Sequence, residues 1–136
     1  MKLLMLYPDR FAYRPATKTL EDVPDCREPD SISEAVVGLI HAEGQDERNE
    51  VGIEKKLVKN LKWAARKNAT RRIILHSFSH LAETKASAEF TRVLLERAEE
   101  RLRGAGYEVR QTPFGYFLDL DIQAPGRSTA RIFTSF

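Results

Sequence analysis

The sequence predicts one α/β domain in which two helices pack on a mixed, curved β-sheet. Residues 51–68 and 86–103 repeat apolar side chains every three to four positions, as amphipathic helices do. Short apolar runs, typical of strands, lie before, between and after these segments, and the long antiparallel series at the carboxyl end is expected to curve the sheet. A length of 136 residues suits a single domain over residues 1–136.

The expected strands are short runs of apolar and β-branched side chains. They cover residues 3–7, 35–42, 71–76, 107–110, 117–122 and 130–136. Residues 8–30 contain four prolines and many charged side chains, so this part is expected to be mostly loop, with Phe11 and Tyr13 in a short edge strand.

Each expected helix has one apolar stripe, which should face the sheet. The stripes consist of Ile53, Leu57 and Leu61 in the first helix and of Phe90 and Leu94 in the second. Gly104 and Gly106 follow the second helix and mark its end.

Composition narrows the class of protein. The 22 Lys and Arg residues against 20 Asp and Glu give a net charge of +2, which permits a nucleic-acid partner without requiring one. A single cysteine, Cys26, excludes a disulfide framework and a zinc site of several thiolates. No apolar run approaches the roughly 20 residues that span a bilayer, and the first residues resemble a strand more than a signal peptide, so a cytoplasmic protein is expected.

Polar, chemically competent side chains follow the apolar run at residues 73–75: His76, Ser77, Ser79 and His80. Ligands bind at the carboxyl ends of strands in open α/β sheets, and histidine exchanges protons near neutral pH, so a site is expected here. His76 and His80 have no third ligand nearby for a metal, and the serines lack the glycines of a nucleophile elbow. The simplest alternative makes His76 a strand residue and His80 a satisfied residue at a helix start.

Two further stretches have two interpretations each. The turn at residues 112–116 carries Phe114 and Tyr116, which either pack on the core or stack on a flat ligand such as a nucleobase or ribose. A basic stretch either forms a solvated helix face or follows a phosphate backbone. It consists of Lys55, Lys56, Lys59, Lys62, Arg66, Lys67, Arg71 and Arg72. The phosphate-binding glycine motifs of ATP-dependent enzymes are absent.

Taken in order, these features resemble a known family. A first strand, a lysine-bearing helix, the motif Phe78, Ser79, His80, Leu81 and then Pro113, Phe114, Gly115, Tyr116 are similar to the N-terminal editing domain of archaeal threonyl-tRNA synthetases. That family shares its fold with D-aminoacyl-tRNA deacylases. The resemblance extends from Lys2 to Ile132.

The resemblance implies hydrolysis of serine from mischarged threonine tRNA. On that analogy His80 and Tyr116 are catalytic, with His80 orienting a water or the terminal ribose. The small amino acid and the pocket wall then involve Phe78, Ser79, Pro113, Phe114 and Gly115. The resemblance also implies a tRNA partner, a homodimer and a synthetase body in cis or in trans, with no metal and no cofactor.

The sequence departs from the family at three places. Leu118 stands where the family has a lysine, Arg131 stands near a family glutamate, and Tyr7 and Pro8 replace a frequent His-Ser pair. Loss of an ammonium and a carboxylate from one small site would lower the rate of hydrolysis more than it would alter the fold. A module of the same fold that binds tRNA or guides dimerisation without hydrolysis is therefore the alternative.

Overall fold

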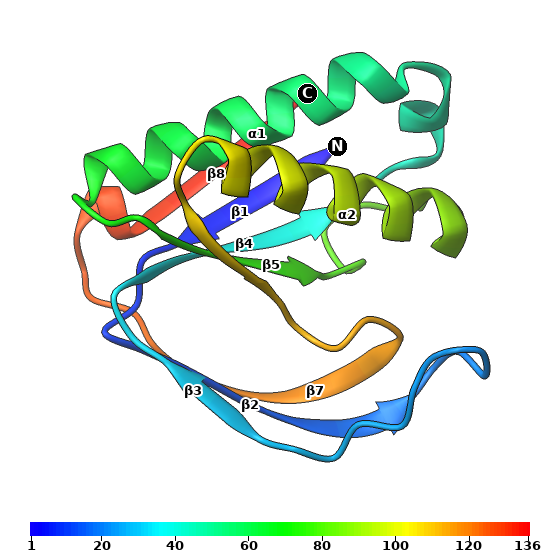
Figure 1. The fold of residues 1–136 in the computed structure, drawn as a ribbon, viewed down its shortest axis with the longest axis horizontal. Coiled ribbons are helices and arrows are strands. Elements are labelled where there is room, and N and C mark those ends of the chain that lie inside the picture. Colours follow the sequence, from blue (N-terminus) through cyan, green and yellow to red (C-terminus); the bar gives the residue numbers. More distant parts are fainter.

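The computed structural model describes all 136 residues in three layers: two helices, a five-stranded sheet and a three-stranded sheet (Figure 1). The helices are α1 (Glu50–Lys67) and α2 (Ala88–Gly104). The strands are β1 (Lys2–Leu6), β2 (Arg10–Lys18), β3 (Asp30–Ile32), β4 (Ala35–His41), β5 (Arg72–Ser77), β6 (Glu108–Gln111), β7 (Tyr116–Gln123) and β8 (Arg131–Ser135). The predicted class, two helices packed on a mixed sheet, is confirmed.

The five-stranded sheet is mixed and has the order β6-β5-β4-β1-β8. β4, β5 and β6 run parallel because the two helices connect them, whereas β1 runs antiparallel to β4 and to β8. Every residue of the central strand β4 is buried, as expected for a strand covered on both faces.

The second sheet is antiparallel, with the order β3-β2-β7, and lies below the first (Figure 1). The prediction that residues 8–30 are mostly loop is wrong for the nine-residue strand β2 and for Asp30 in β3. β3 pairs only with residues Phe11 to Tyr13, so Pro15 lies where one side of β2 has no partner and needs no amide hydrogen there. A register shift between Pro15 and Thr17 also accommodates the proline.

The main core lies between the helices and the five-stranded sheet. Ile53, Leu57, Leu61 and Leu94 are buried there, as predicted, and Phe90 packs against the same core while remaining partly exposed. A smaller core fills the space between the two sheets and includes Phe11 and Val37. Both faces of the five-stranded sheet are therefore covered, and binding sites remain at its ends.

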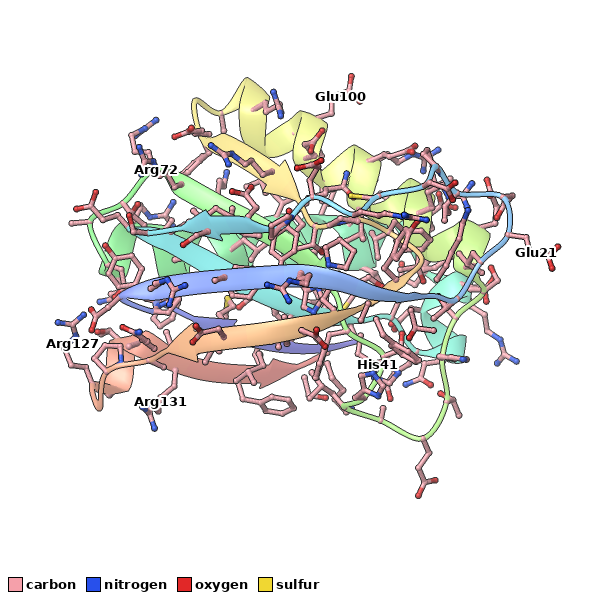
Figure 2. The ribbon with its side chains drawn as sticks, turned by 90° about the horizontal axis from the view of Figure 1, so that it is seen from below. Glu21, His41, Arg72, Glu100, Arg127 and Arg131 are labelled. Carbon is pink, nitrogen blue, oxygen red and sulfur yellow. The ribbon has the colours of Figure 1, made fainter.

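The register defines two ends of this sheet. His41 and Ser77 lie near the carboxyl ends of β4 and β5, and Lys2 pairs with His41. Leu6 pairs with Arg131 at the other end. Figure 2 shows the same separation, with His41 far from Arg127 and Arg131.

Candidate functional site

A cavity of about 240 Å³ lies at the carboxyl end of β5, between the segment after this strand, the start of α2 and the turn before β7. Six of the seven residues predicted for the site line it: Ser79, His80, Pro113, Phe114, Gly115 and Tyr116. The structure thus brings together two motifs that are more than thirty positions apart in the sequence.

His80 contributes an exposed imidazole to this cavity. Its ring meets the ring of Phe78 edge-on at 4.8 Å between centroids and lies 5.9 Å from the ring of Phe117. The amide of His80 donates to the carbonyl of Phe78 at 3.0 Å, which makes a tight turn directly after β5. This turn places His80 just beyond the carboxyl end of β5.

Phe78 is the predicted residue that does not line the cavity. Its ring packs against the smaller core between the two sheets, and it lies 5.6 Å from the ring of His76. Its amide donates to the carbonyl of Ile40 at 2.9 Å, so the backbone of Phe78 continues the contact between β5 and β4. The ring of Phe78 therefore packs between the smaller core and the ring of His80.

The hydroxyl of Tyr116 is occupied by the loop before β3. It accepts a hydrogen bond from the amide of Cys26 at 2.9 Å and donates to the carbonyl of Pro24 at 3.1 Å. The aromatic ring lines the cavity while the hydroxyl anchors the loop. This arrangement places Tyr116 as a wall of the cavity.

Gly115 lets the same loop approach the turn. Its φ of +84° lies in the left-handed region, which favours glycine, and a Cβ built there would be 3.0 Å from both methyl carbons of Val23. The carbonyl of Gly115 accepts from the amide of Thr19 at 2.7 Å. The sequence Pro-Phe-Gly-Tyr thus fixes one side of the cavity against residues 19–23.

His76 points away from the cavity and is buried. Its Nδ1 is 2.9 Å from the hydroxyl oxygen of Thr112. Burial, with a smaller contribution from the nearby His80, lowers the pKa of His76 to about 4, so the ring is neutral near pH 7. His76 lies in β5, so the alternative interpretation, which made it a strand residue, is correct for His76.

His41, which sequence analysis did not single out, holds the segment that follows His80. Its Nδ1 accepts from the amide of Leu81 at 2.9 Å, so the proton of the neutral ring sits on Nε2, which donates to the carbonyl of Thr84 at 2.7 Å. The ring is buried at the end of β4. Both partners lie about forty positions away in the sequence, which is why no local pattern revealed this role.

Other residues lining the cavity were also missed by sequence analysis. Lys85 is the one cationic side chain other than histidine, and no carboxylate or thiol lines the space. The others that were missed are Thr19, Leu20, Ala86, Ala88, Thr91 and Phe117, whereas Ser77, which also lines the cavity, was among the polar residues noted after the apolar run. Without an acidic side chain, the cavity offers one imidazole, one ammonium, hydroxyls and backbone groups for chemistry.

The departures from the family do not share this cavity. Leu118 lies in β7 beside Phe117, but it does not line the space. Arg131 pairs with Leu6 and donates to the carbonyl of Pro125 at 2.8 Å, at the opposite end of the sheet (Figure 2). The expectation that Leu118 and Arg131 mark losses from one small site is not supported by these positions.

A larger hollow, of about 560 Å³, lies on the three-stranded sheet and involves Arg10, Asp30, Asp119 and Asp121. It contains no histidine or cysteine, and Arg10 already pairs with Asp121 at 2.8 Å. The smaller cavity at His80 is therefore the better candidate for a catalytic site.

The structure contains no cluster of three or more metal-ligating side chains. No helix is long and apolar enough to cross a membrane.

The fold and the sequence of this chain are each similar to those of known proteins. A solved structure, the c-Myc DNA Unwinding Element Binding Protein, shares the fold with a TM-score of 0.69 at 14% identity, over 100% of this chain and 99% of the other. The family model for the Archaea-specific editing domain of threonyl-tRNA synthetase matches residues 1–136, so the chain belongs to that family.

Curated relatives agree with this family. The chain is 29% identical over 135 residues to a threonine–tRNA ligase of Thermococcus kodakarensis and 28% identical over 134 residues to one of Methanobrevibacter smithii. Each match covers 97% of this chain but 22% of the relative. The chain therefore spans about a fifth of the length of these relatives.

Proposed function

We propose that this chain hydrolyses the ester bond of Ser-tRNA(Thr), the mischarged product of a threonyl-tRNA synthetase. The observation that supports this best is the cavity at the end of β5, which gathers His80 and the Pro-Phe-Gly-Tyr turn around a space of about 240 Å³. This volume is below the 300–1,000 Å³ typical of drug-sized ligands, and it suits an aminoacyl group with part of a ribose.

The chemistry requires a positioned water and donors for the developing oxyanion. The water oxygen bonds to the ester carbonyl carbon, the bond from that carbon to the ribose oxygen breaks, and the ribose oxygen takes a proton. His80 is the one imidazole that faces the cavity, because His76 is buried and held against Thr112. His80 orients the water or the ribose hydroxyl, and backbone groups around Ser79 contact the aminoacyl group.

Selectivity comes from the wall of the cavity. Serine and threonine differ by one methyl group, which a single pocket distinguishes by about 1–3 kcal/mol, so a second site that excludes the methyl group raises fidelity. Pro113, Phe114 and Tyr116 form the wall against which that methyl group would press. The Tyr116 hydroxyl holds the loop at Pro24 and Cys26, so we assign Tyr116 a positioning role in place of a proton-transfer role.

Partners follow from this function. The substrate is a tRNA, and a synthetase body in cis or in trans would supply it. Since charging of tRNA for translation takes place in the cytoplasm, we place the chain there. β8 is an edge strand with Phe133 exposed on it, and a two-fold homodimer that covers this edge fits the arrangement.

A second candidate is a module of the same fold that binds tRNA or dimerises without hydrolysis. It is favoured by a cavity lining that contains no carboxylate. Leu118, which stands where the family has a lysine, lies outside this lining. A hydrolytic assay separates the two candidates.

The test measures deacylation of Ser-tRNA(Thr) by the wild-type chain, with Thr-tRNA(Thr) as the control substrate. His80→Ala should slow hydrolysis by about 10²- to 10⁴-fold if the imidazole takes part in proton transfer. Leu118→Lys should raise the rate if a missing ammonium limits it. Absence of activity in wild type and in Leu118→Lys would favour the non-hydrolytic module.

A further inference from the structure

The outer face of α1 is strongly basic. Six cations lie along this helix, and five of them are exposed: Lys55, Lys56, Lys59, Arg66 and Lys67. The sixth, Lys62, is half-buried. We call these six cations, together with Trp63, the α1 basic face.

The carboxylates of α1 do not neutralise this face. The helix has two acidic residues, and both point to the neighbouring helix: Glu50 pairs with Arg97, and Glu54 pairs with Arg101 at 2.9 Å. None of the six cations of the α1 basic face makes an ion pair with a carboxylate. Because the acids bind α2, the charge on the outer side of α1 remains uncompensated.

The spacing arranges these cations in a line. Lys55, Lys59, Lys62 and Arg66 follow one another at intervals of four, three and four residues, so they project from one side of the helix. At a rise of about 1.5 Å per residue, the line is about 16 Å long. The opposite side of the helix carries Leu57 and Leu61 in the core, so the line faces away from the sheet.

An aromatic ring interrupts the charges. Trp63 is 41% exposed, and the Nζ of Lys67 lies 5.8 Å from the centroid of its ring. A large exposed ring among unpaired cations is the combination with which proteins hold nucleic acids, because cations contact phosphates and rings stack on unpaired bases. An acidic protein partner would need only the positive charges of this face, so it would not explain why the ring of Trp63 is exposed among them.

We propose that the α1 basic face binds the phosphate backbone of tRNA. The inference rests on the proposed function in one respect, since tRNA is the nucleic acid that an editing domain meets. The face is separate from the cavity at His80, because no residue of α1 lines that cavity. Binding and hydrolysis are thereby assigned to different surfaces.

The experiment uses the single tryptophan of the chain as the reporter. Because Trp63 is the only tryptophan and lies on this face, its fluorescence reports occupancy directly. Unmodified tRNA(Thr) is titrated into the chain at several salt concentrations, and the affinity is measured in parallel by filter binding. One double variant, Lys59→Gln with Lys62→Gln, removes two charges from the α1 basic face. The matched control, Arg14→Gln with Arg27→Gln, removes two charges from another part of the surface, where both arginines are exposed and make no ion pair.

We expect tRNA to change the fluorescence of Trp63 and the affinity to fall steeply with salt. Each lost phosphate contact should flatten the plot of log affinity against log salt by about 0.7 to 0.9. The Lys59 and Lys62 double variant should therefore bind about 25- to 60-fold more weakly at 0.1 M salt, relative to equal affinities at 1 M salt. The control double variant should keep the wild-type affinity to within about threefold. Equal losses in the two double variants would overturn the inference, because they would show a general effect of charge.

Three other outcomes are decisive. Binding of tRNA without a change in Trp63 fluorescence would place the contact elsewhere and overturn the inference, as would the absence of binding at low salt. Salt-dependent binding through this face in a chain that does not deacylate Ser-tRNA(Thr) would support the inference while contradicting the proposed function. His80→Ala should retain the fluorescence change, which separates the face from the cavity.

Discussion

At the scale of single residues, three histidines have three roles that their surroundings decide. His76 is buried against Thr112, His41 bridges Leu81 and Thr84, and His80 is exposed at the cavity. The sequence places all three after or within apolar strands, so only their contacts distinguish them. The chemistry of the site therefore depends on one imidazole.

The low pKa of His76, about 4, makes stability depend on pH. Its ordinary pKa of 6.5 applies to the unfolded chain, so between pH 6.5 and pH 4 the unfolded state binds the extra proton and stability falls as the pH falls. The full effect is about 3 kcal/mol, and it is absent above pH 6.5. Urea unfolding at pH 7 and pH 4.5 should show this loss in wild type and a smaller one in His76→Asn. The same pH dependence in both proteins would contradict the assignment.

The sequence allowed part of the site to be predicted. Ser79 and His80 directly follow a strand, and the Pro-Phe-Gly-Tyr turn directly precedes one, so sheet geometry brings them to one end. Lys85 and Thr91 reach the same cavity from the segment before α2 and from α2 itself. Their positions depend on how that segment is held by His41, a contact between distant residues that no local pattern encodes.

At the scale of elements, α1 is held to the sheet by its apolar stripe. Leu61 is fully buried and lies above Gly38 of β4, where an added Cβ would be 2.9 Å from Leu61 Cδ2. Leu61→Ala should therefore lower the free energy of unfolding by about 2–5 kcal/mol, as measured by urea denaturation. Val51→Ala on the same helix is the control, because Val51 is 62% exposed and should change stability by less than about 0.5 kcal/mol. Similar losses in the two variants would contradict this packing.

The turn before β7 should be sensitive to one methyl group. Gly115→Ala places a Cβ against Val23 in a left-handed conformation, so we expect a loss of about 1–3 kcal/mol in thermal or urea unfolding. It should also displace the loop that Tyr116 anchors and thereby slow deacylation. Gly126→Ala has open space around its Cβ and serves as the control. If Gly115→Ala were as stable and active as Gly126→Ala, the turn would not be what shapes the cavity.

Most elements could be predicted because their apolar residues follow a regular local pattern in the sequence. The apolar stripes of α1 and α2 and the buried runs of β4 and β5 follow their periods closely. Only the part of β2 around Phe11 and Tyr13 was predicted. The rest was missed because Pro15 normally ends a strand, and a proline is tolerated here only because β3 is short. The division into two sheets could not be predicted either, because it depends on the pairing of β2 with β7, which is distant in the sequence.

At the scale of the whole molecule, β8 leaves one edge of the five-stranded sheet open. Phe133 is 56% exposed on this strand, and an exposed apolar edge favours pairing with a second copy. We expect a homodimer by light scattering and a monomer after Phe133→Lys, with Phe117→Lys on β7 as a control that keeps the dimer. A monomeric wild type, or a dimer that survives Phe133→Lys, would contradict pairing through this edge.

The central claim is that this domain removes serine, and not threonine, from threonine tRNA. The most direct test is the single-turnover rate of deacylation of Ser-tRNA(Thr) and of Thr-tRNA(Thr) by the wild-type chain. Because the two substrates differ by one methyl group that meets the wall of the His80 cavity, the account predicts hydrolysis of the seryl ester about 10- to 200-fold faster. Equal rates for the two esters, or no hydrolysis of either, would contradict it.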